Sequence, residues 1–538
     1  MIDPFSVTVE ARQGVTQRLH DLPIFKRSRS AAIYNFFAAL EKSTSLVTAN
    51  PEAAHALGRR AIEATHRAIP AIFAKCRPGS ESELSLNPAA VQEASDLLEY
   101  ACIFDQVITC YELAEYSQFD MAYDRKSECI KFTCASGQES NAGNLMRSRE
   151  VASKWERRLA GANLHTLAVL STSIRAVLLG SIRFVGPGEI SFAYSPELLA
   201  LARQWAGIDA RKTQWELPDH LAIDTFTLAD AKKFWSAVGV IANIHDMAQL
   251  VASNGDERLY PSNSLVNVKT TPEWVYLISE IGGISEEAAS AMLAWHTFDP
   301  VVSASTAMIQ PFIEAAPGRL CICLTLVGNL DFERNLVKLV NRHPKLRPSS
   351  VAIKAIKQKV ALGSLSGLFP SSQFNFAADV KLAGLTNADL VIHERSSGFV
   401  LVLQHKWLTA PETPYESSLN DEQLKEGAAQ AVEARDALRK NHILLGNALN
   451  LTPSDLIGEI HAAVVTCETE SSGFQEMPPV PIVPQSAFIN LWDGSSSLTQ
   501  LWKNLNERPD RLELVAKFAG AFRRIDIGEY NFLVPVLG

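Results

Sequence analysis

Three polar residues lie at the ends of two apolar segments and could do chemistry together. Asp389 stands near the start of the segment 388–395, and Gln404 and Lys406 close the segment 399–407. A hard divalent cation accepts carboxylate and amide oxygens as ligands, and it can deliver hydroxide and neutralise growing negative charge. A nearby ammonium can orient the attacking water, or take its proton if burial lowers the pKa of the lysine. These residue types predict metal-assisted hydrolysis of a phosphodiester.

Each of these residues has an expected role. Asp389 is the expected anionic metal ligand, Gln404 offers its amide oxygen, and the backbone carbonyl of His405 adds a third oxygen. The expected cation is Mg²⁺, with Mn²⁺ as a substitute, because Mg²⁺ takes one or two carboxylates together with water and phosphate. Lys406 is the expected base or phosphate-neutralising group.

Glu333 is a candidate for a further catalytic acid. It belongs to an expected helix at 331–340 and shares the packing face of Leu336, Val337 and Val340. A carboxylate on a packing face is costly unless it has a partner. The alternative is that Glu333 only favours the helix dipole in the first turn.

The two segments are expected to form a hairpin, because Ser396-Ser397-Gly398 joins them. A two-residue turn at Ser396-Ser397 sets Asp389 opposite Gln404, and one at Ser397-Gly398 sets it opposite Lys406. Both turns place Asp389 on the face of Gln404 and Lys406, with Cβ atoms of facing residues about 5 Å apart. A three-residue loop would instead pair Asp389 with His405.

The surrounding elements are expected to follow the order helix, three strands, helix, strand. The strands are 373–382, 388–395, 399–407 and 459–467, and the helices are 331–340 and 421–440. With Asp389 and the Gln404-His405-Lys406 triplet, this order resembles the PD-(D/E)XK nuclease superfamily. Gln-x-Lys in place of Glu-x-Lys or Asp-x-Lys is similar to Mrr-type restriction endonucleases. The resemblance implies a restriction-endonuclease-like core, Mg²⁺-dependent cleavage of DNA, and a role in restriction, anti-phage defence or mobile elements.

The 538-residue chain is expected to have several domains. Residues 1–310 have the apolar spacing of helices and form the expected recognition or assembly region. Residues 316–478 form the expected α/β nuclease-like domain, and 485–538 a small C-terminal α/β extension after a proline-rich linker.

Composition is that of an ordinary globular protein, with 47% hydrophobic and 20% charged residues. The net charge of −9 argues against a chain that coats nucleic acid with its whole surface, but it allows a local basic groove such as the lysine- and arginine-rich stretch 330–360. The eight cysteines form no CxxC pair, and the first residues lack a signal pattern. We therefore expect a cytoplasmic protein away from membranes. DNA is the expected nucleic-acid partner, with RNA as the alternative, and a second copy of the chain or a defence-system protein is a further candidate partner.

Structural interpretations of the same residues stay open. Asp389 could be a turn residue, Gln404 a surface amide and Lys406 a strand-end lysine. His405 is expected on the apolar face and Gln430 on a solvated helix face, while His393 shares the face of Asp389. The alternative functions are a catalytically impaired nuclease-fold protein that binds nucleic acid or acts as a scaffold, and a helical interaction protein with a purely structural sheet.

Overall fold

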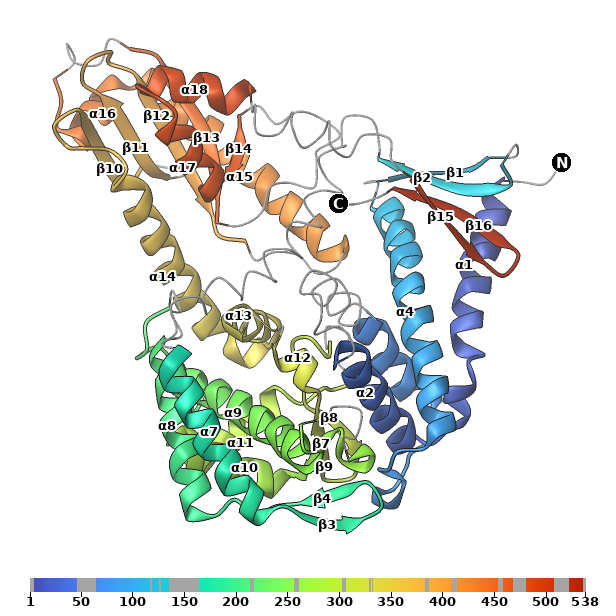
Figure 1. Ribbon diagram of the computed structural model, residues 1–538. Helices are drawn as coiled ribbons and strands as arrows, with labels where there is room; N and C mark the ends of the chain where they lie inside the picture. Colours follow the sequence, from blue (N-terminus) through green and yellow to red (C-terminus); the bar gives the residue numbers. More distant parts are fainter. Residues whose placement is uncertain are drawn as a thin grey trace. The chain divides into compact units, whose positions relative to one another are not determined.

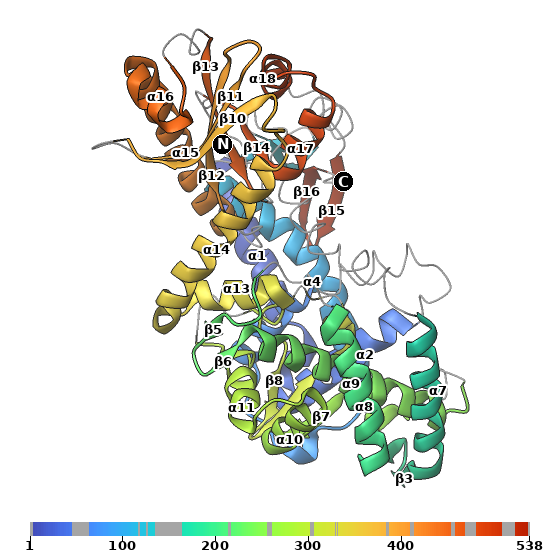
Figure 2. The same cartoon turned by 90° about the vertical axis from the view of Figure 1, so that its left-hand side faces the viewer.

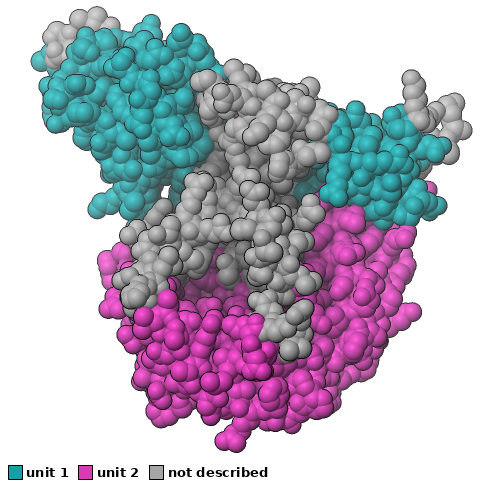
Figure 3. Space-filling view, viewed as in Figure 1, with its two compact units in different colours: residues 1–9, 107–152, 351–538 teal, residues 10–106, 153–350 magenta. Residues whose placement is uncertain are grey.

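The computed structural model describes residues 4–45, 64–116, 119–124, 127–134, 164–212, 217–255, 261–301, 306–328, 330, 332–382, 387–408, 414–452, 458–467, 480–507 and 522–535. The chain divides into two compact units, each assembled from separate stretches of sequence (Figure 3). Unit 1 comprises residues 1–9, 107–152 and 351–538, and unit 2 comprises residues 10–106 and 153–350. The domain bounds expected from the sequence stay a prediction.

Unit 2 is mainly helical. Its longer helices, besides one at 64–75, are α2 (Arg29–Ser45), α7 (Leu164–Ser181), α8 (Pro196–Lys212), α9 (Leu228–Ala252), α10 (Thr271–Gly282), α11 (Glu286–Trp295) and α13 (Phe332–Arg342). Helices α1 (Pro4–His20) and α4 (Pro88–Glu115) contain residues of both units. A three-stranded sheet in the order β7 (Asn267–Thr270), β9 (Arg319–Ile322), β8 (Ile313–Ala316) accompanies them.

Local sequence signals explain where these helices begin and end. Helix α10 starts at a capping box, in which Thr270 accepts from the Glu273 amide while the Glu273 carboxylate accepts from the Thr270 amide. It ends at Gly283, whose φ of 61° lies in the left-handed region that glycine adopts without strain. Local sequence signals therefore fix both ends of α10 within the region expected to be helical.

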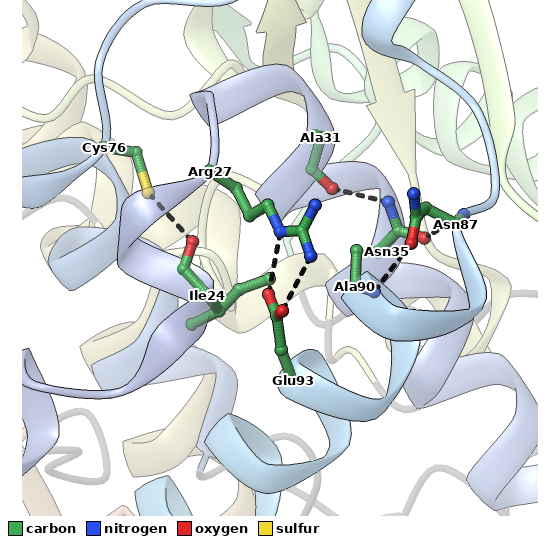
Figure 4. A network of polar contacts seen from close by, with 8 residues as sticks. All are labelled: Ile24, Arg27, Ala31, Asn35, Cys76, Asn87, Ala90 and Glu93. Atoms are coloured by element: carbon green, nitrogen blue, oxygen red, sulfur yellow. Dashed lines mark hydrogen bonds and ion pairs between the residues drawn. The ribbon is translucent and has the colours of Figure 1, made fainter.

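A polar network joins α2 and the residues just before it to the start of α4 within unit 2 (Figure 4). The guanidinium of Arg27 donates to both carboxylate oxygens of Glu93, at 2.9 and 2.7 Å. Asn35 Nδ2 donates to the carbonyl of Ala31 at 2.8 Å, and its Oδ1 accepts from the backbone N–H of Asn87 at 3.0 Å. Asn35 is fully buried, so these bonds satisfy an amide that would otherwise be costly to bury.

Unit 1 contains a four-stranded sheet built from distant parts of the sequence. Its order is β1 (Phe119–Asp124), β2 (Cys129–Cys134), β16 (Tyr530–Pro535), β15 (Phe522–Ile527), and β16 runs parallel to β2. The rings of Phe132 and Phe532 both meet the ring of Tyr111 from α4.

Unit 1 also contains a five-stranded sheet, and this sheet carries the polar residues predicted to do chemistry. Its order follows the sequence: β10 (Phe374–Val380), β11 (Ala388–Glu394), β12 (Val400–Lys406), β13 (Ile460–Thr466) and β14 (Ile482–Pro484). The first three strands are antiparallel, whereas β12, β13 and β14 are parallel. Helix α15 (Pro414–Lys440) connects β12 to β13, as a parallel connection requires.

Helices cover both faces of this sheet (Figures 1 and 2). On one face, Val391, Val402 and Val464 pack with residues of α15 and α16 (His442–Leu449). On the other, Leu390, Leu401 and Val465 pack with α17 (Gln485–Asp493), α18 (Leu498–Glu507) and the end of α14 (Arg347–Ser366). Because side chains alternate along a strand, the apolar residues of the central strands serve two cores.

The expectation of a mixed α/β chain with a mostly helical N-terminal part is confirmed. The expected strands 388–395, 399–407 and 459–467 correspond closely to β11, β12 and β13. The apolar run 318–327 suggests one strand, but only Arg319–Ile322 forms the strand β9, and α12 (Leu324–Gly328) follows it. The basic stretch 330–360 contains part of a helix before β10, α14, and its role as a groove stays a prediction. Within the region 1–310 expected to be helical, residues 46–63 and 135–163 lie outside the described residues.

None of the described helices combines the length and the apolar character that crossing a lipid bilayer would demand.

Candidate functional site

The hairpin of β11 and β12 has the register that sets Asp389 opposite Gln404. The pairs run from His393↔Val400 to Leu390↔Leu403, and one further step joins these two residues. The connection is not the expected two-residue turn. Glu394 donates its N–H to the carbonyl of Phe399, which leaves four loop residues, and Gly398 ends the loop with a φ of 69°. A two-residue turn at Ser396-Ser397 gives the same register, so the wider loop leaves the pairing unchanged.

The sheet opens between β11 and β12 at the site. Strand β11 stays paired with β10 as far as Val380↔Ala388, and β12 stays paired with β13 as far as Lys406↔Thr466. Between them the ladder stops at Leu390↔Leu403. Beyond this point the N–H of His405 donates to the side chain of Asp389, at 2.7 Å to Oδ2. A carboxylate thus occupies the place where the backbone pairing ends.

Asp389 is a buried carboxylate held by neutral donors. Only 7% of its surface is exposed, and Gln358 Nε2 of α14 donates to Oδ1 at 2.9 Å. Burial raises the pKa of the Asp389 carboxyl, although the His405 N–H and the charge of Lys406 act against this rise. Each carboxylate oxygen accepts one of these two hydrogen bonds and keeps a lone pair for another partner.

Gln404 presents an oxygen without a partner. It is 7% exposed, and its Nε2 donates to Gln430 Oε1 of α15 at 3.4 Å. Its Oε1 is buried and has no hydrogen-bond partner among the described residues. Buried polar atoms are nearly always paired, so an oxygen of this kind is suited to an additional ligand or water.

Lys406 is bound by Gln430, which also contacts Gln404. Its Nζ donates to Gln430 Oε1 at 2.8 Å. Burial lowers the pKa of the Lys406 ammonium, with Lys354 of α14 acting in the same direction and Glu426 and Asp389 against it. In the described part of the chain, Lys406 has no ion-pair partner; its hydrogen bond goes to a neutral amide oxygen.

Gln430 was expected on a solvated helix face, and this expectation is wrong. Gln430 is half-buried, contacts both Gln404 and Lys406, and donates from Nε2 to Glu426 Oε1 at 3.0 Å. The sequence carries a weak signal for it, since Gly427 and Gln430 share one face of α15. Gly427 leaves the room that the methylene groups of Lys406 occupy.

Two more residues lie near the site, and the sequence alone does not identify them. Gln358 lies on α14, where the sequence suggested only a basic stretch. Asp379 of β10 is skipped by the ladder between Ala378↔Leu390 and Val380↔Ala388, and its charge adds to the rise of the Asp389 pKa. Its φ of 50° is unusual for a residue with a side chain.

His405 borders the site through its backbone, whereas its side chain faces away from Gln404 and Lys406. His405 is 4% exposed and alternates with Gln404 and Lys406, so its ring lies on the opposite face; burial lowers its pKa to about 4. His393 lies near the other end of β11, where its Nδ1 is 3.3 Å from Asn375 Nδ2. Glu333 is in α13 of unit 2, and its Oε1 accepts from the N–H of Leu217 at 3.3 Å.

The donor set available to a metal ion is small. Among the described residues, no three Asp, Glu, His or Cys side chains gather in a way that could hold an ion. The opening between β11 and β12 instead offers one carboxylate, one amide oxygen and backbone oxygens. A hard cation bound there would need water or substrate oxygens to complete its shell, as Mg²⁺ usually does.

Comparison of the chain with protein-family models, with curated proteins and with solved structures finds no match.

Proposed function

We propose that this chain is a Mg²⁺-dependent endonuclease of the PD-(D/E)XK type that hydrolyses phosphodiester bonds in DNA. One observation carries the proposal. Asp389 and Lys406, partly buried and opposite in charge, share one opening in the sheet, and neutral amides hold both of them. A structural pair would gain most from direct neutralisation, since uncompensated buried charges are costly. Keeping both charges available is useful for binding a cation and an anionic substrate.

The order of elements supports a restriction-endonuclease-like core. Helix α14 precedes β10, β11 and β12, and α15 then leads to the parallel strand β13. The helix expected first, 331–340, is α13 of unit 2, and α14 instead stands directly before β10. With α14 in that place, and with α16 following α15, the order is similar to the helix, three strands, helix, strand order of the resemblance. In this core the site would lie where the central hairpin separates.

Asp389 and Gln404 would hold the cation, with the His405 carbonyl as a third donor. The free lone pairs of Asp389 and the unpartnered Gln404 Oε1 fit this role. The N–H of His405 points at Asp389, and in an extended strand the carbonyl of a residue points to the same side as its N–H. When bound, the cation would supply an activated water and neutralise charge on the phosphate.

Lys406 would position the water and bind a phosphate oxygen. Its Nζ is a donor that is already oriented by Gln430, which leaves two further N–H groups for substrate and water. The burial that lowers the pKa of Lys406 also favours a role in which Nζ accepts a proton from the water.

The test is cleavage by the full chain. Plasmid DNA, single-stranded DNA and RNA are incubated with Mg²⁺, Mn²⁺ or excess chelator, and products are followed on gels. We expect DNA cleavage that the chelator abolishes and that Lys406→Ala lowers by at least about 100-fold. The matched control is Lys503→Ala, an exposed lysine on α18 outside the basic stretch 330–360, which should cleave like the wild type. Absence of metal-dependent cleavage on all three substrates would overturn the proposal.

The alternative is a nuclease-fold protein that binds nucleic acid without cutting it. The neutral Gln404 favours it, because a glutamine contributes less to cation binding than a glutamate would. Fluorescence anisotropy with labelled DNA separates the two functions. Salt-dependent binding without cleavage supports the alternative, whereas binding with metal-dependent cleavage supports the nuclease.

A further inference from the structure

Two charged neighbours of Gln430 determine which end of its amide is the oxygen and which is the nitrogen. Its Oε1 faces Lys406 Nζ at 2.8 Å, and an ammonium can only donate. Its Nε2 faces Glu426 Oε1 at 3.0 Å, and a carboxylate can only accept. The chemistry of the two charged partners therefore assigns both ends of the Gln430 amide.

The orientation of the Gln430 amide also determines the orientation of the Gln404 amide. The group of Gln404 that meets Gln430 Oε1, at 3.4 Å, has to be the donor Nε2. Its oxygen then lies at the other end of the amide, where it is buried without a partner among the described residues. The register sets Gln404 opposite Asp389, so this oxygen and the carboxylate belong to the same face of the sheet.

We propose that Gln430 is a positioning residue that turns the amide oxygen of Gln404 toward the cation. The proposal rests on the proposed function, because it concerns the same cation. A glutamine ligand has one end that binds a cation and one that repels it, whereas a glutamate has two equivalent oxygens. A neutral ligand at position 404 therefore needs a neighbour that fixes its orientation, and the chain Glu426–Gln430–Gln404 supplies one.

We expect the loss of Mn²⁺ affinity on replacing Gln430 to depend on which residue stands at position 404. Gln430→Met keeps the length of the side chain and removes both ends of its amide. In the Gln404 background we expect this change to weaken Mn²⁺ binding by about 10-fold or more, the size typical of residues that orient a ligand. In the Gln404→Glu background the same change should weaken binding by only about 2-fold, because no orientation remains to be set.

The experiment is a double-mutant cycle on the full chain without DNA. Mn²⁺ affinity is measured by calorimetry for the wild type, Gln430→Met, Gln404→Glu and the double variant, and thermal midpoints check folding. Gln423→Met is the matched control, an exposed glutamine two turns earlier on α15, and should bind like the wild type. The second test is Glu426→Gln combined with Gln430→Glu. This exchange reverses the hydrogen bond between the two residues and keeps the net charge. Because it moves a carboxylate toward the site, it should bind Mn²⁺ at least as tightly as the wild type.

The outcomes separate the inference from the proposed function. If Gln430→Met weakens binding equally in both backgrounds, or not at all in the Gln404 background, Gln430 does not orient Gln404. If Gln430→Met unfolds the chain, the exchanged pair decides, because loss of Mn²⁺ affinity in a folded exchanged pair overturns the inference. If neither the wild type nor Gln404→Glu binds Mn²⁺, the metal site itself is wrong and the proposed function fails with it.

Discussion

Gly427 of α15 and Lys406 of β12 fit against each other with no space for a side chain between them. A Cβ at position 427 would lie 2.8 Å from Cε and 3.0 Å from Cγ of Lys406. Alanine favours a helix over glycine by up to about 1 kcal/mol, and a lysine side chain can move aside. We therefore expect Gly427→Ala to leave the thermal midpoint unchanged or raised, and to lower cleavage by about 10-fold by displacing Nζ.

Gly363→Ala provides the control for this change. Gly363 lies in α14, where an added Cβ meets nothing within 4 Å. This variant should gain the same helix propensity and keep full cleavage. Full cleavage by Gly427→Ala would show that the position of Lys406 does not matter for the reaction.

Asp389→Asn should separate stability from activity. Because burial raises the pKa of Asp389, the folded chain binds a proton more readily than the unfolded chain does, and stability falls as pH rises above the unfolded value. At pH 7 the ionised carboxylate therefore costs stability. Asparagine can still accept from the His405 N–H, and Gln358 can turn its amide to match. We expect a raised thermal midpoint together with a loss of cleavage of at least about 100-fold.

Asp389→Leu is the informative comparison. It also removes the charge, but it leaves the N–H of His405 without its side-chain acceptor. A buried unsatisfied donor costs about 1–3 kcal/mol, so this variant should melt below Asp389→Asn. Equal midpoints for the two variants would contradict the hydrogen bond.

Buried histidines should make the chain sensitive to acid. Burial lowers the pKa of His245 and of His296 to about 4, and the charge of Lys269 contributes at His245. Between an unfolded pKa of about 6.5 and the folded value, the unfolded chain binds more protons, so stability falls as pH falls. The limiting slope is about 1.4 kcal/mol per pH unit for each histidine.

Urea unfolding at several pH values between 7.5 and 4 measures this slope. His245→Gln can still donate to the carbonyl of Ser264, which His245 Nε2 contacts at 2.7 Å, but it cannot bind a proton. The variant should therefore show a shallower loss of stability toward low pH. An unchanged pH dependence would exclude His245 as a source of the acid sensitivity.

Asn35→Leu should destabilise the helical unit 2. The change leaves the carbonyl of Ser85 and the N–H of Asn87 without the amide that now bonds to them, at 3.2 and 3.0 Å. We expect a loss of about 2–4 kcal/mol in the free energy of unfolding. Arg27→Met breaks a partly exposed ion pair and should cost at most about 1 kcal/mol. A cost for Asn35→Leu as small as that for Arg27→Met would contradict the network of Figure 4.

The central hairpin could be predicted because its signals are local. Apolar alternation and a short Ser-Ser-Gly connection predict β11 and β12 nearly to their ends, but they leave three registers open, and the structure has the one that sets Asp389 opposite Gln404. The loop proved wider than a tight turn, yet the face shared by Asp389, Gln404 and Lys406 did not depend on that detail.

What the sequence could not reveal depends on tertiary packing. A glutamine on a polar helix face has the same pattern whether it faces water or a neighbouring lysine, so Gln430 could not be assigned. The many lysines and arginines of α14 suggest phosphate binding, and they make its helical periodicity hard to recognise. Glu333 was chosen from its own helix alone, and the residue that its carboxylate accepts from, Leu217, is 116 residues away.

Strand β16, near the end of the sequence, pairs with β2. The side chain of Asn531 donates to the carbonyl of Glu128, which lies 403 residues earlier in the chain. A ribosome adds about 5–20 residues each second, so β2 would wait roughly 20–80 s for this neighbour. During that interval one edge of β2 would be bare and open to pairing with other chains. Slow translation or truncation before residue 522 should therefore promote aggregation, and chaperones that cover exposed strands should matter for the yield of this protein.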